Sequence, residues 1–161
     1  MILKFTSWYL SQKKKKTGSN PGQFNQGNGK GNRELKMKNL LREFTPGFLA
    51  ANRYKLSAAE ALERADALLL DVRSADEEEC MSIAEDLAHY PGIGYLHIPM
   101  NELPDRLDEL PDDREILVFC RTTNRSAMVY AFLRTQGFGR VRLVEGGYVA
   151  LVKLLVAAHG I

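Results

Sequence analysis

Cys120 is the residue of this chain whose surroundings are best suited to covalent chemistry. It ends a short apolar run of β-forming residues, 116–119, and residues 127–134 after it have the apolar stripe of a helix. A strand, a tight loop and a helix in this order direct backbone N–H groups and the positive end of a helix dipole toward the loop. Arg121 and Arg125 add two full charges there. Positive charge beside a thiol favours the thiolate, so we predict a nucleophilic cysteine that acts on an anionic substrate.

The spacing of the loop restricts the size of the bound group. Four residues separate Cys120 from Arg125, which gives the pattern C-x4-R, and position 126 is serine. Cysteine phosphatases use C-x5-R, because a loop that surrounds a tetrahedral phosphate needs one more amide. The shorter loop suits a smaller guest, such as one sulfur atom carried on the cysteine as a persulfide.

Four short segments occur in an order that points to a known family. They are 70–73 (Leu-Asp-Val-Arg), 98–103 (Ile-Pro-Met-Asn-Glu-Leu), 120–126 (Cys-Arg-Thr-Thr-Asn-Arg-Ser) and 145–148 (Glu-Gly-Gly-Tyr). Together they resemble the landmarks of single-domain rhodanese-like sulfurtransferases, from about residue 54 to residue 159. The resemblance implies an α/β three-layer sandwich with a mainly parallel central sheet and helices on both faces. It also implies transfer of sulfane sulfur from a donor such as thiosulfate, through a Cys120 persulfide, to a thiophilic acceptor, without a cofactor.

The resemblance also suggests roles for individual residues. Cys120 would be the nucleophile. The substrate-binding loop would comprise Arg121, Thr122, Thr123, Asn124, Arg125 and Ser126. The supporting residues would be Asp71, Arg73, Gly146, Gly147 and Tyr148. Arg125 would face the anion, although it could instead cap carbonyl groups or pair with an acid. Arg121 could steer anionic donors or point into solvent.

The supporting residues have non-catalytic interpretations as well. We expect Asp71 and Arg73 to form an ion pair that ties loops around the site, since a carboxylate beside the thiolate would oppose its ionisation. Gly146 and Gly147 would permit close backbone approach and Tyr148 would line the pocket, or all three could serve a turn and the core.

Two features depart from the family pattern. Thr123 stands where the loop often has glycine, and threonine resists positive φ, so a differently shaped cradle is expected. The segment 74–95 is longer than usual and reads as a helix, which would alter the wall of the site and affect the choice of substrate.

Periodicity and turn residues predict the remaining elements. Expected helices cover 37–48, 57–64, 75–89, a short stretch between Leu103 and Leu110, a segment after residue 126 that ends at Gly137, and 148–158; expected strands cover 67–72, 95–98, 115–119 and 141–144. Strands that alternate with helices predict a parallel sheet, with the ligand at the carboxyl ends of the strands. Cys80 falls in the third helix, either packed there or as a resolving thiol for Cys120.

Composition excludes several classes of protein. The 161 residues, 45% hydrophobic, suffice for one domain. No apolar run approaches the roughly eighteen residues of a membrane span, and His89, His97 and His159 lack metal-ligand spacing. With two cysteines, a disulfide framework is not indicated. A reducing, cytoplasmic setting fits best.

Charge separates the N-terminal 36 residues from the rest. They carry eight Lys and Arg against one acid, a charge of +7, whereas residues 37–161 carry fourteen against nineteen, a charge of −5. We expect this basic, Gly/Asn/Gln-rich extension to be disordered. It could be a basic tail that contacts RNA, an anionic membrane surface or an unknown partner. It could instead be a solvated tail, or sequence upstream of a true start at Met37. A helix and linker over 37–53 and a domain over 54–161 would follow it.

Two other functions remain open at this point. A sulfur carrier would accept a persulfide and deliver it to one protein partner, with little turnover of small acceptors. A phosphatase-like or arsenate-reducing activity is disfavoured by the C-x4-R spacing. No nucleic-acid role is expected for the domain.

Overall fold

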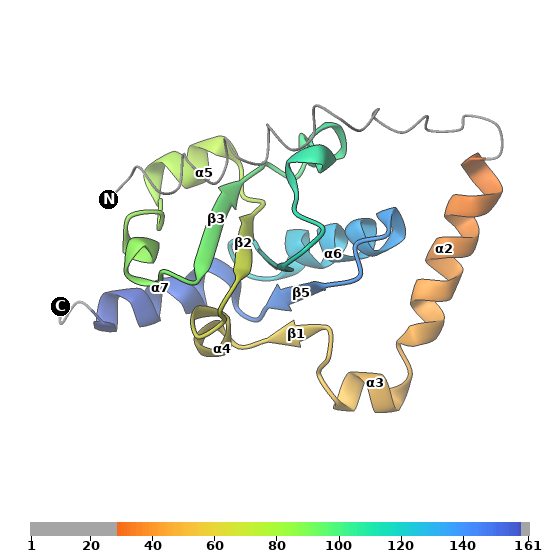
Figure 1. Cartoon of the computed structure of the whole chain (residues 1–161), viewed down its shortest axis with the longest axis horizontal. Helices are drawn as coiled ribbons and strands as arrows, with labels where there is room; N and C mark the ends of the chain where they lie inside the picture. The colour runs from red at the N-terminus through yellow and green to blue at the C-terminus, as the bar shows by residue number, and fades with distance from the viewer. Residues whose placement is uncertain (1–28, 159–161) are drawn as a thin grey trace. The chain divides into compact units, whose positions relative to one another are not determined.

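A computed structural model describes residues 29–158, whose central element is a five-stranded sheet (Figure 1). The strands are β1 (Lys55–Leu56), β2 (Ala67–Asp71), β3 (Ile93–His97), β4 (Glu115–Phe119) and β5 (Val141–Val144). Their order in the sheet is β1-β5-β4-β2-β3, and every pair of neighbours is parallel. The chain divides into residues 1–34 and 35–161, and this sheet belongs to the second unit.

The register of the central strands places their carboxyl ends together. Asp71, the last residue of β2, pairs with Phe119, the last residue of β4, and with His97 at the end of β3. Cys120 directly follows Phe119, so it emerges at the edge of the sheet where ligands bind in folds of this kind.

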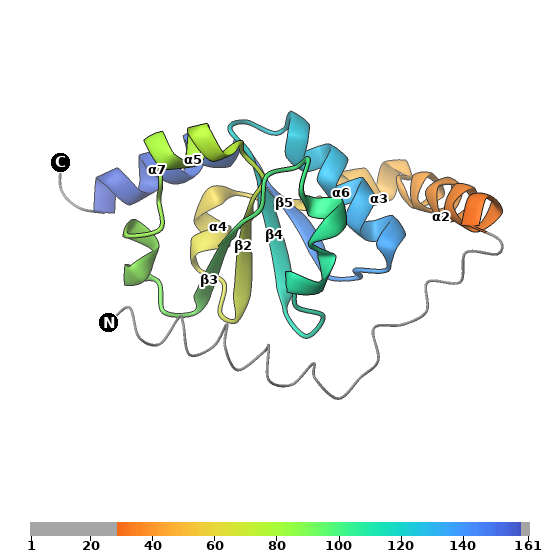
Figure 2. The ribbon, with the colours of Figure 1, turned by 90° about the horizontal axis from the view of Figure 1, so that it is seen from above.

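Helices cover both faces of the sheet, as Figure 2 shows, with α6 on one side and α4, α5 and α7 on the other. The central strands are buried on both faces because their side chains alternate between two apolar clusters. Leu68 and Leu70 of β2 pack with Val129 and Leu133 of α6 (Asn124–Gln136). Leu69 packs into the second cluster, with α4 (Ala58–Leu62) and α7 (Gly147–Ala158). The predicted α/β three-layer architecture is therefore confirmed.

Several local predictions are also confirmed. Strands β4 and β5 have the predicted bounds. Ser57 and Glu60 form the capping box that begins α4, each side chain bonded to the other residue's backbone N–H. Gly137 ends α6 with a φ of 104°, which residues other than glycine rarely adopt. The two-residue strand β1 was missed because so short a strand has no recognisable pattern.

The prediction of one helix over 37–48 was wrong at both ends. Helix α2 (Gly29–Glu43) begins earlier, so residues 29–36, which were assigned to a disordered extension, are helical. Residues 33–36 are good helix formers that extend the pattern of the following segment. Pro46 begins a new helix, α3 (Pro46–Ala50), because proline is well suited to a first turn and the Thr45 side chain accepts a bond from Phe48 N–H. Residues 1–28 lie outside the described part of the chain.

The predicted helix over 75–89 was wrong in its length. Helix α5 (Ala75–Cys80) ends at Cys80, and a 3₁₀ turn follows at Asp86–His89. The carbonyl of Met81 accepts a hydrogen bond from Arg73 Nη1 at 3.0 Å, and Ile83 and Leu87 turn into the core. Tertiary contacts therefore replace the helical pattern.

Two further segments differ slightly from expectation. The helix expected between Leu103 and Leu110 is a pair of 3₁₀ turns, Leu103–Asp105 and Leu107–Glu109. Strand β3 begins and ends earlier than the predicted 95–98. Within residues 29–158, no helix has the length and apolar character that crossing a membrane requires.

Candidate active site

The Cys120 thiol lies between the end of β4 and the first turn of α6. Its Sγ is 3.7 Å from the Oγ of Ser126, and this hydroxyl in turn donates to the Thr123 carbonyl at 2.8 Å. Cys120 is buried, with 2% of its surface exposed. The sulfur is thus directed at the N-terminus of a thirteen-residue helix, where backbone N–H groups and the helix dipole favour negative charge.

Helix α7 fixes the shape of the loop through the loop's carbonyl groups. Tyr148 N–H donates to the Cys120 carbonyl at 2.8 Å, and Val149 N–H donates to the Arg121 carbonyl at 3.3 Å. Gly147 makes this approach possible, because a Cβ there would lie 2.3 Å from the Cys120 oxygen and 2.4 Å from the Thr122 oxygen. Its φ of 54° is a second reason for glycine. The predicted close approach is confirmed at Gly147.

The backbone N–H groups of the loop remain available to a ligand. Among the backbone hydrogen bonds of the described residues outside helices and strands, none has Arg121, Thr122 or Thr123 as its donor. The first residues of α6 add N–H groups that have no partner within the helix. Since the carbonyls are held by α7, the loop can offer a set of donors to an anion or to a sulfur atom carried on Cys120.

Arg125 forms a two-pronged ion pair with Glu77 of α5. Arg125 Nη1 donates to Oε2 at 2.5 Å and Nη2 donates to Oε1 at 2.8 Å. The pair is partly exposed, at 34% for Arg125 and 23% for Glu77. The hydrogen bond to Glu77 is the main reason that the pKa of Arg125 is raised, and the nearby Cys120 sulfur contributes. The alternative in which Arg125 pairs with an acid is confirmed, whereas its binding of a substrate anion stays a prediction.

The predicted ion pair of Asp71 and Arg73 is confirmed and is completely buried. Arg73 Nε lies 3.0 Å from both carboxylate oxygens and Nη2 lies 2.6 Å from Oδ2. Burial lowers the pKa of Arg73, but the bonds and charge of Asp71 outweigh this effect and raise it. The guanidinium carbon is 4.4 Å from the centre of the Tyr148 ring, a cation–π contact that joins β2 to the start of α7.

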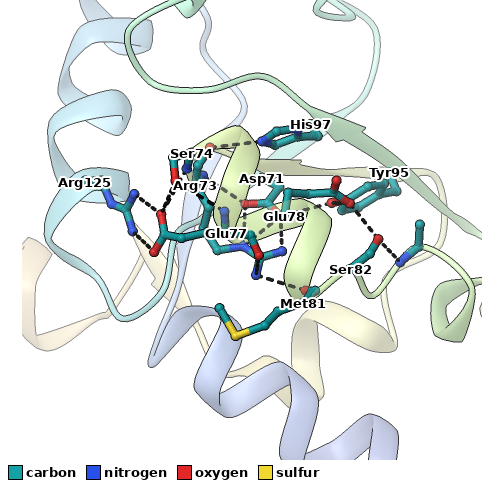
Figure 3. A network of polar contacts seen from close by, with 11 residues as sticks. Asp71, Arg73, Ser74, Glu77, Glu78, Met81, Ser82, Tyr95, His97 and Arg125 are labelled. Carbon is teal, nitrogen blue, oxygen red and sulfur yellow. Dashed lines mark hydrogen bonds and ion pairs between the residues drawn. The ribbon is translucent and has the colours of Figure 1, made fainter.

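A polar network extends from this pair to α5 and β3 (Figure 3). The Tyr95 hydroxyl lies 3.0 Å from Asp71 Oδ2 and 3.1 Å from Glu78 Oε1. Burial and the two carboxylates raise the pKa of Tyr95 strongly, so it remains a neutral donor. His97 Nε2 is 3.0 Å from the Arg73 carbonyl. The network joins the carboxyl ends of β2 and β3 to the helix that carries Glu77.

The other predicted residues of the loop have different degrees of exposure. Arg121, Thr122 and Asn124 are exposed, and Arg121 is in none of the ion pairs found among the described residues. Thr123 has a φ of −153°, so this position does not require glycine, and its side chain makes no capping bond. Gly146 lies beside Ala150 of α7 and its carbonyl accepts from Ala150 N–H at 3.3 Å.

Glu77 was missed as a candidate residue. Ser74 accepts a bond from Glu77 N–H, and the Glu77 carboxylate accepts bonds from Ser74 N–H and Oγ. The spacing Ser-x-x-Glu is the signature of a capping box, and recognising it would have fixed the start of α5. It would not have revealed the contact with Arg125, which depends on the fold.

The position of the second cysteine differs from the expectation. Cys80 is exposed at the end of α5, so the interpretation of a packed helix cysteine was wrong. Among the residues described here, no group of His, Cys, Asp and Glu is arranged to hold a metal ion.

Comparison with known proteins gives consistent matches over this region. The family model for the rhodanese-like domain matches residues 56–154. A sulfurtransferase of Allochromatium vinosum is 36% identical over 96 residues, which cover 60% of this chain and 77% of that protein. The Bacillus subtilis protein named putative sulfur carrier protein YrkF is 34% identical over 99 residues. That match covers 62% of this chain but 46% of YrkF, so the chain spans about half the length of that relative.

A solved structure agrees with the sequence matches. The crystal structure of a rhodanese-related protein from Thermoplasma volcanium superposes with a TM-score of 0.50 at 29% identity. The superposition covers 62% of this chain and 91% of that protein.

Proposed function

Because this chain belongs to the rhodanese-like domain family, we propose that it transfers sulfane sulfur through a persulfide on Cys120. The observation that carries this proposal is the geometry of the loop. The sulfur points at the first turn of α6, while α7 binds the loop carbonyls and leaves the loop amides available. Such a cradle suits a cysteine that carries one more sulfur atom.

The first half-reaction loads the cysteine. The Cys120 thiolate attacks the outer sulfur of a small anionic donor such as thiosulfate, a new S–S bond forms, and sulfite leaves with the electron pair of the broken bond. The positive end of α6 and the free loop amides stabilise the negative charge on the leaving group and on the persulfide. Arg121, which is exposed, attracts anions from solvent, whereas Arg125 is paired with Glu77.

The second half-reaction regenerates the thiolate. A thiol, cyanide or a sulfur-accepting protein attacks the outer sulfur of the persulfide, takes it, and releases Cys120 with the electron pair. No step needs a cofactor. Asp71, Arg73 and Tyr148 support the wall of the site through their ion pair and ring contact. A free thiolate is best maintained in a reducing compartment, so we place the reaction in the cytoplasm.

Intact-mass measurement tests the proposal directly. We expect thiosulfate or a small persulfide to add one sulfur atom to the wild type and to Cys80→Ser, and none to Cys120→Ser. Cys80 is an apt control because it is the other cysteine of the chain and is exposed. Two outcomes would overturn the proposal: addition of sulfur to Cys120→Ser, or failure of every sulfane donor to add sulfur to the wild type.

A sulfur carrier is the second candidate, favoured by the similarity to the protein named as a putative sulfur carrier. A carrier would load but would turn over slowly with small acceptors. Steady-state turnover with cyanide and with a small thiol separates the two functions. Repeated cycling indicates an enzyme of small substrates, and a persulfide that loads once and persists indicates delivery to a protein partner.

A further inference from the structure

Glu77 already neutralises the loop arginine that an anionic donor would need. Both terminal nitrogens of Arg125 are bonded to the two oxygens of one carboxylate. This geometry matches the way in which arginine binds a carboxylate or sulfonate-like group from a ligand. A donor that used the same nitrogens would have to displace Glu77.

The carboxylate of Glu77 is held in place from its own side as well. Its Oε2 accepts bonds from Ser74 N–H and Ser74 Oγ, both at 3.0 Å, in the capping box of α5. Arg125 is the main cause of a pKa for Glu77 of about 2. The carboxylate is therefore charged throughout the physiological range and is not free to swing away from Arg125.

The charge around the pair also disfavours a doubly charged donor. Helix α5 carries four consecutive acids at 76–79 and no basic residue. Asp76 and Glu79 are exposed beside the paired Glu77. Arg121 is the exposed cation that the loop retains. An approaching dianion would meet a neutralised arginine and an acidic helix, whereas a donor that carries less negative charge would be repelled less.

We propose, on the basis of the sulfur transfer described above, that Glu77 is a specificity-determining residue that favours sulfane sulfur carried on a thiol, as a persulfide, over the dianion thiosulfate. In the favoured reaction the Cys120 thiolate attacks the outer sulfur of R–S–SH. A new S–S bond forms between Cys120 Sγ and the outer sulfur, the S–S bond of the donor breaks, and the thiolate R–S⁻ leaves with the electron pair. The proton stays on the transferred sulfur, so atoms and charge balance.

The ratio of two loading rates tests this inference. Second-order rates of persulfide formation on Cys120 are measured with thiosulfate and with cysteine hydropersulfide, in the wild type, Glu77→Gln and Glu79→Gln. Glutamine keeps the capping box, which accepts Gln in place of Glu. Glu79→Gln removes the same charge from an exposed position of the same helix. We expect the ratio of the thiosulfate rate to the persulfide rate to rise about tenfold in Glu77→Gln and to change little in Glu79→Gln.

Salt dependence and a second variant provide two further tests of the role of Glu77. The thiosulfate rate in Glu77→Gln should fall more steeply with ionic strength than in the wild type, because its arginine is no longer neutralised. Glu77→Asp keeps the charge but withdraws the carboxylate from Arg125, so a smaller rise in the ratio is expected. Equal ratios in the wild type and both Glu77 variants would overturn the inference while leaving sulfur transfer intact. Failure of both donors to load the wild type would instead overturn the proposed function.

Discussion

Two arginine–carboxylate pairs lie at the same end of the sheet and differ in what surrounds them. The pair of Arg73 and Asp71 has no exposed side-chain surface, and that of Arg125 and Glu77 is about a quarter to a third exposed. Their geometry is otherwise alike, since each arginine donates two or more short bonds to one carboxylate. Burial is therefore the variable that separates them.

The difference shows how similar chemical groups serve separate purposes. The Arg73 guanidinium is bound on every side by Asp71, the Met81 carbonyl and the Tyr148 ring, so a substrate cannot reach it. Arg125 has a single carboxylate partner, contact with solvent and a place beside the nucleophile. We infer that the first pair stabilises the wall of the site and the second sets the charge that a donor meets.

The largest effect on stability should come from the buried pair. Asp71→Asn leaves the buried guanidinium without its counter-ion, and breaking such a pair costs about 3–5 kcal/mol. Urea unfolding followed by circular dichroism measures this loss. Asp76→Asn, at an exposed position on α5, is the control and should change the free energy of unfolding by less than about 0.5 kcal/mol. Equal losses of unfolding free energy in the two variants would show that the buried ion pair stabilises the fold no more than an exposed carboxylate does.

Removal of the Tyr95 hydroxyl, which joins the buried pair to α5, should cause a smaller loss of stability. Tyr95→Phe deletes the hydroxyl that bonds to Asp71 and Glu78, and loss of a hydrogen bond to a charged group costs about 1.5–3 kcal/mol. Thermal unfolding compares it with Tyr90→Phe, since Tyr90 is half-buried and its hydroxyl makes no hydrogen bond to another described residue. A Tyr95 variant as stable as the Tyr90 variant would contradict the role of the network.

The smallest effect, and the one most specific to the exposed pair, depends on pH. Folding lowers the pKa of Glu77 from 4.5 to about 2, chiefly through Arg125. Between these values the unfolded chain binds a proton that the folded chain does not, so acid favours unfolding. The stabilisation is complete above pH 4.5 and is lost as the pH falls toward 2.

Comparison of the wild type with Glu77→Gln isolates this contribution from the other carboxylates. The free energy of unfolding of the wild type should exceed that of the variant by about 1 kcal/mol or less at neutral pH, and the two should converge as the pH falls through the window. A constant difference down to pH 2 would mean that Glu77 is not the group responsible.

The sequence predicted the parts of the site that local rules control. Strand β4, the nucleophile after it and the start of α6 follow from an apolar run, a loop and a helical stripe, all within one short segment. The buried pair was also predicted, since Asp71 and Arg73 are two residues apart and directly follow a strand.

The contacts that were missed join distant segments. Glu77 meets Arg125 across forty-eight positions, and nothing in either local pattern specifies the partner. The predicted end of α5 was wrong for a related reason. Arg73, just after β2, donates a hydrogen bond to the Met81 carbonyl, which takes the place of a helical hydrogen bond there. Both features depend on tertiary contacts, which the periodicity of the sequence does not reveal.

The contact of Gly147 with the loop carbonyls has a consequence for the order of assembly. The N–H groups that hold Cys120 and Arg121 belong to Tyr148 and Val149, which follow β5, the next strand along the chain. The nucleophile's loop cannot take its final shape until β5 has joined the sheet and α7 has docked. Contacts between such separated segments form late because loop closure must precede them. A nascent chain would therefore complete its reactive centre as one of its last folding events, after most of the sheet is in place.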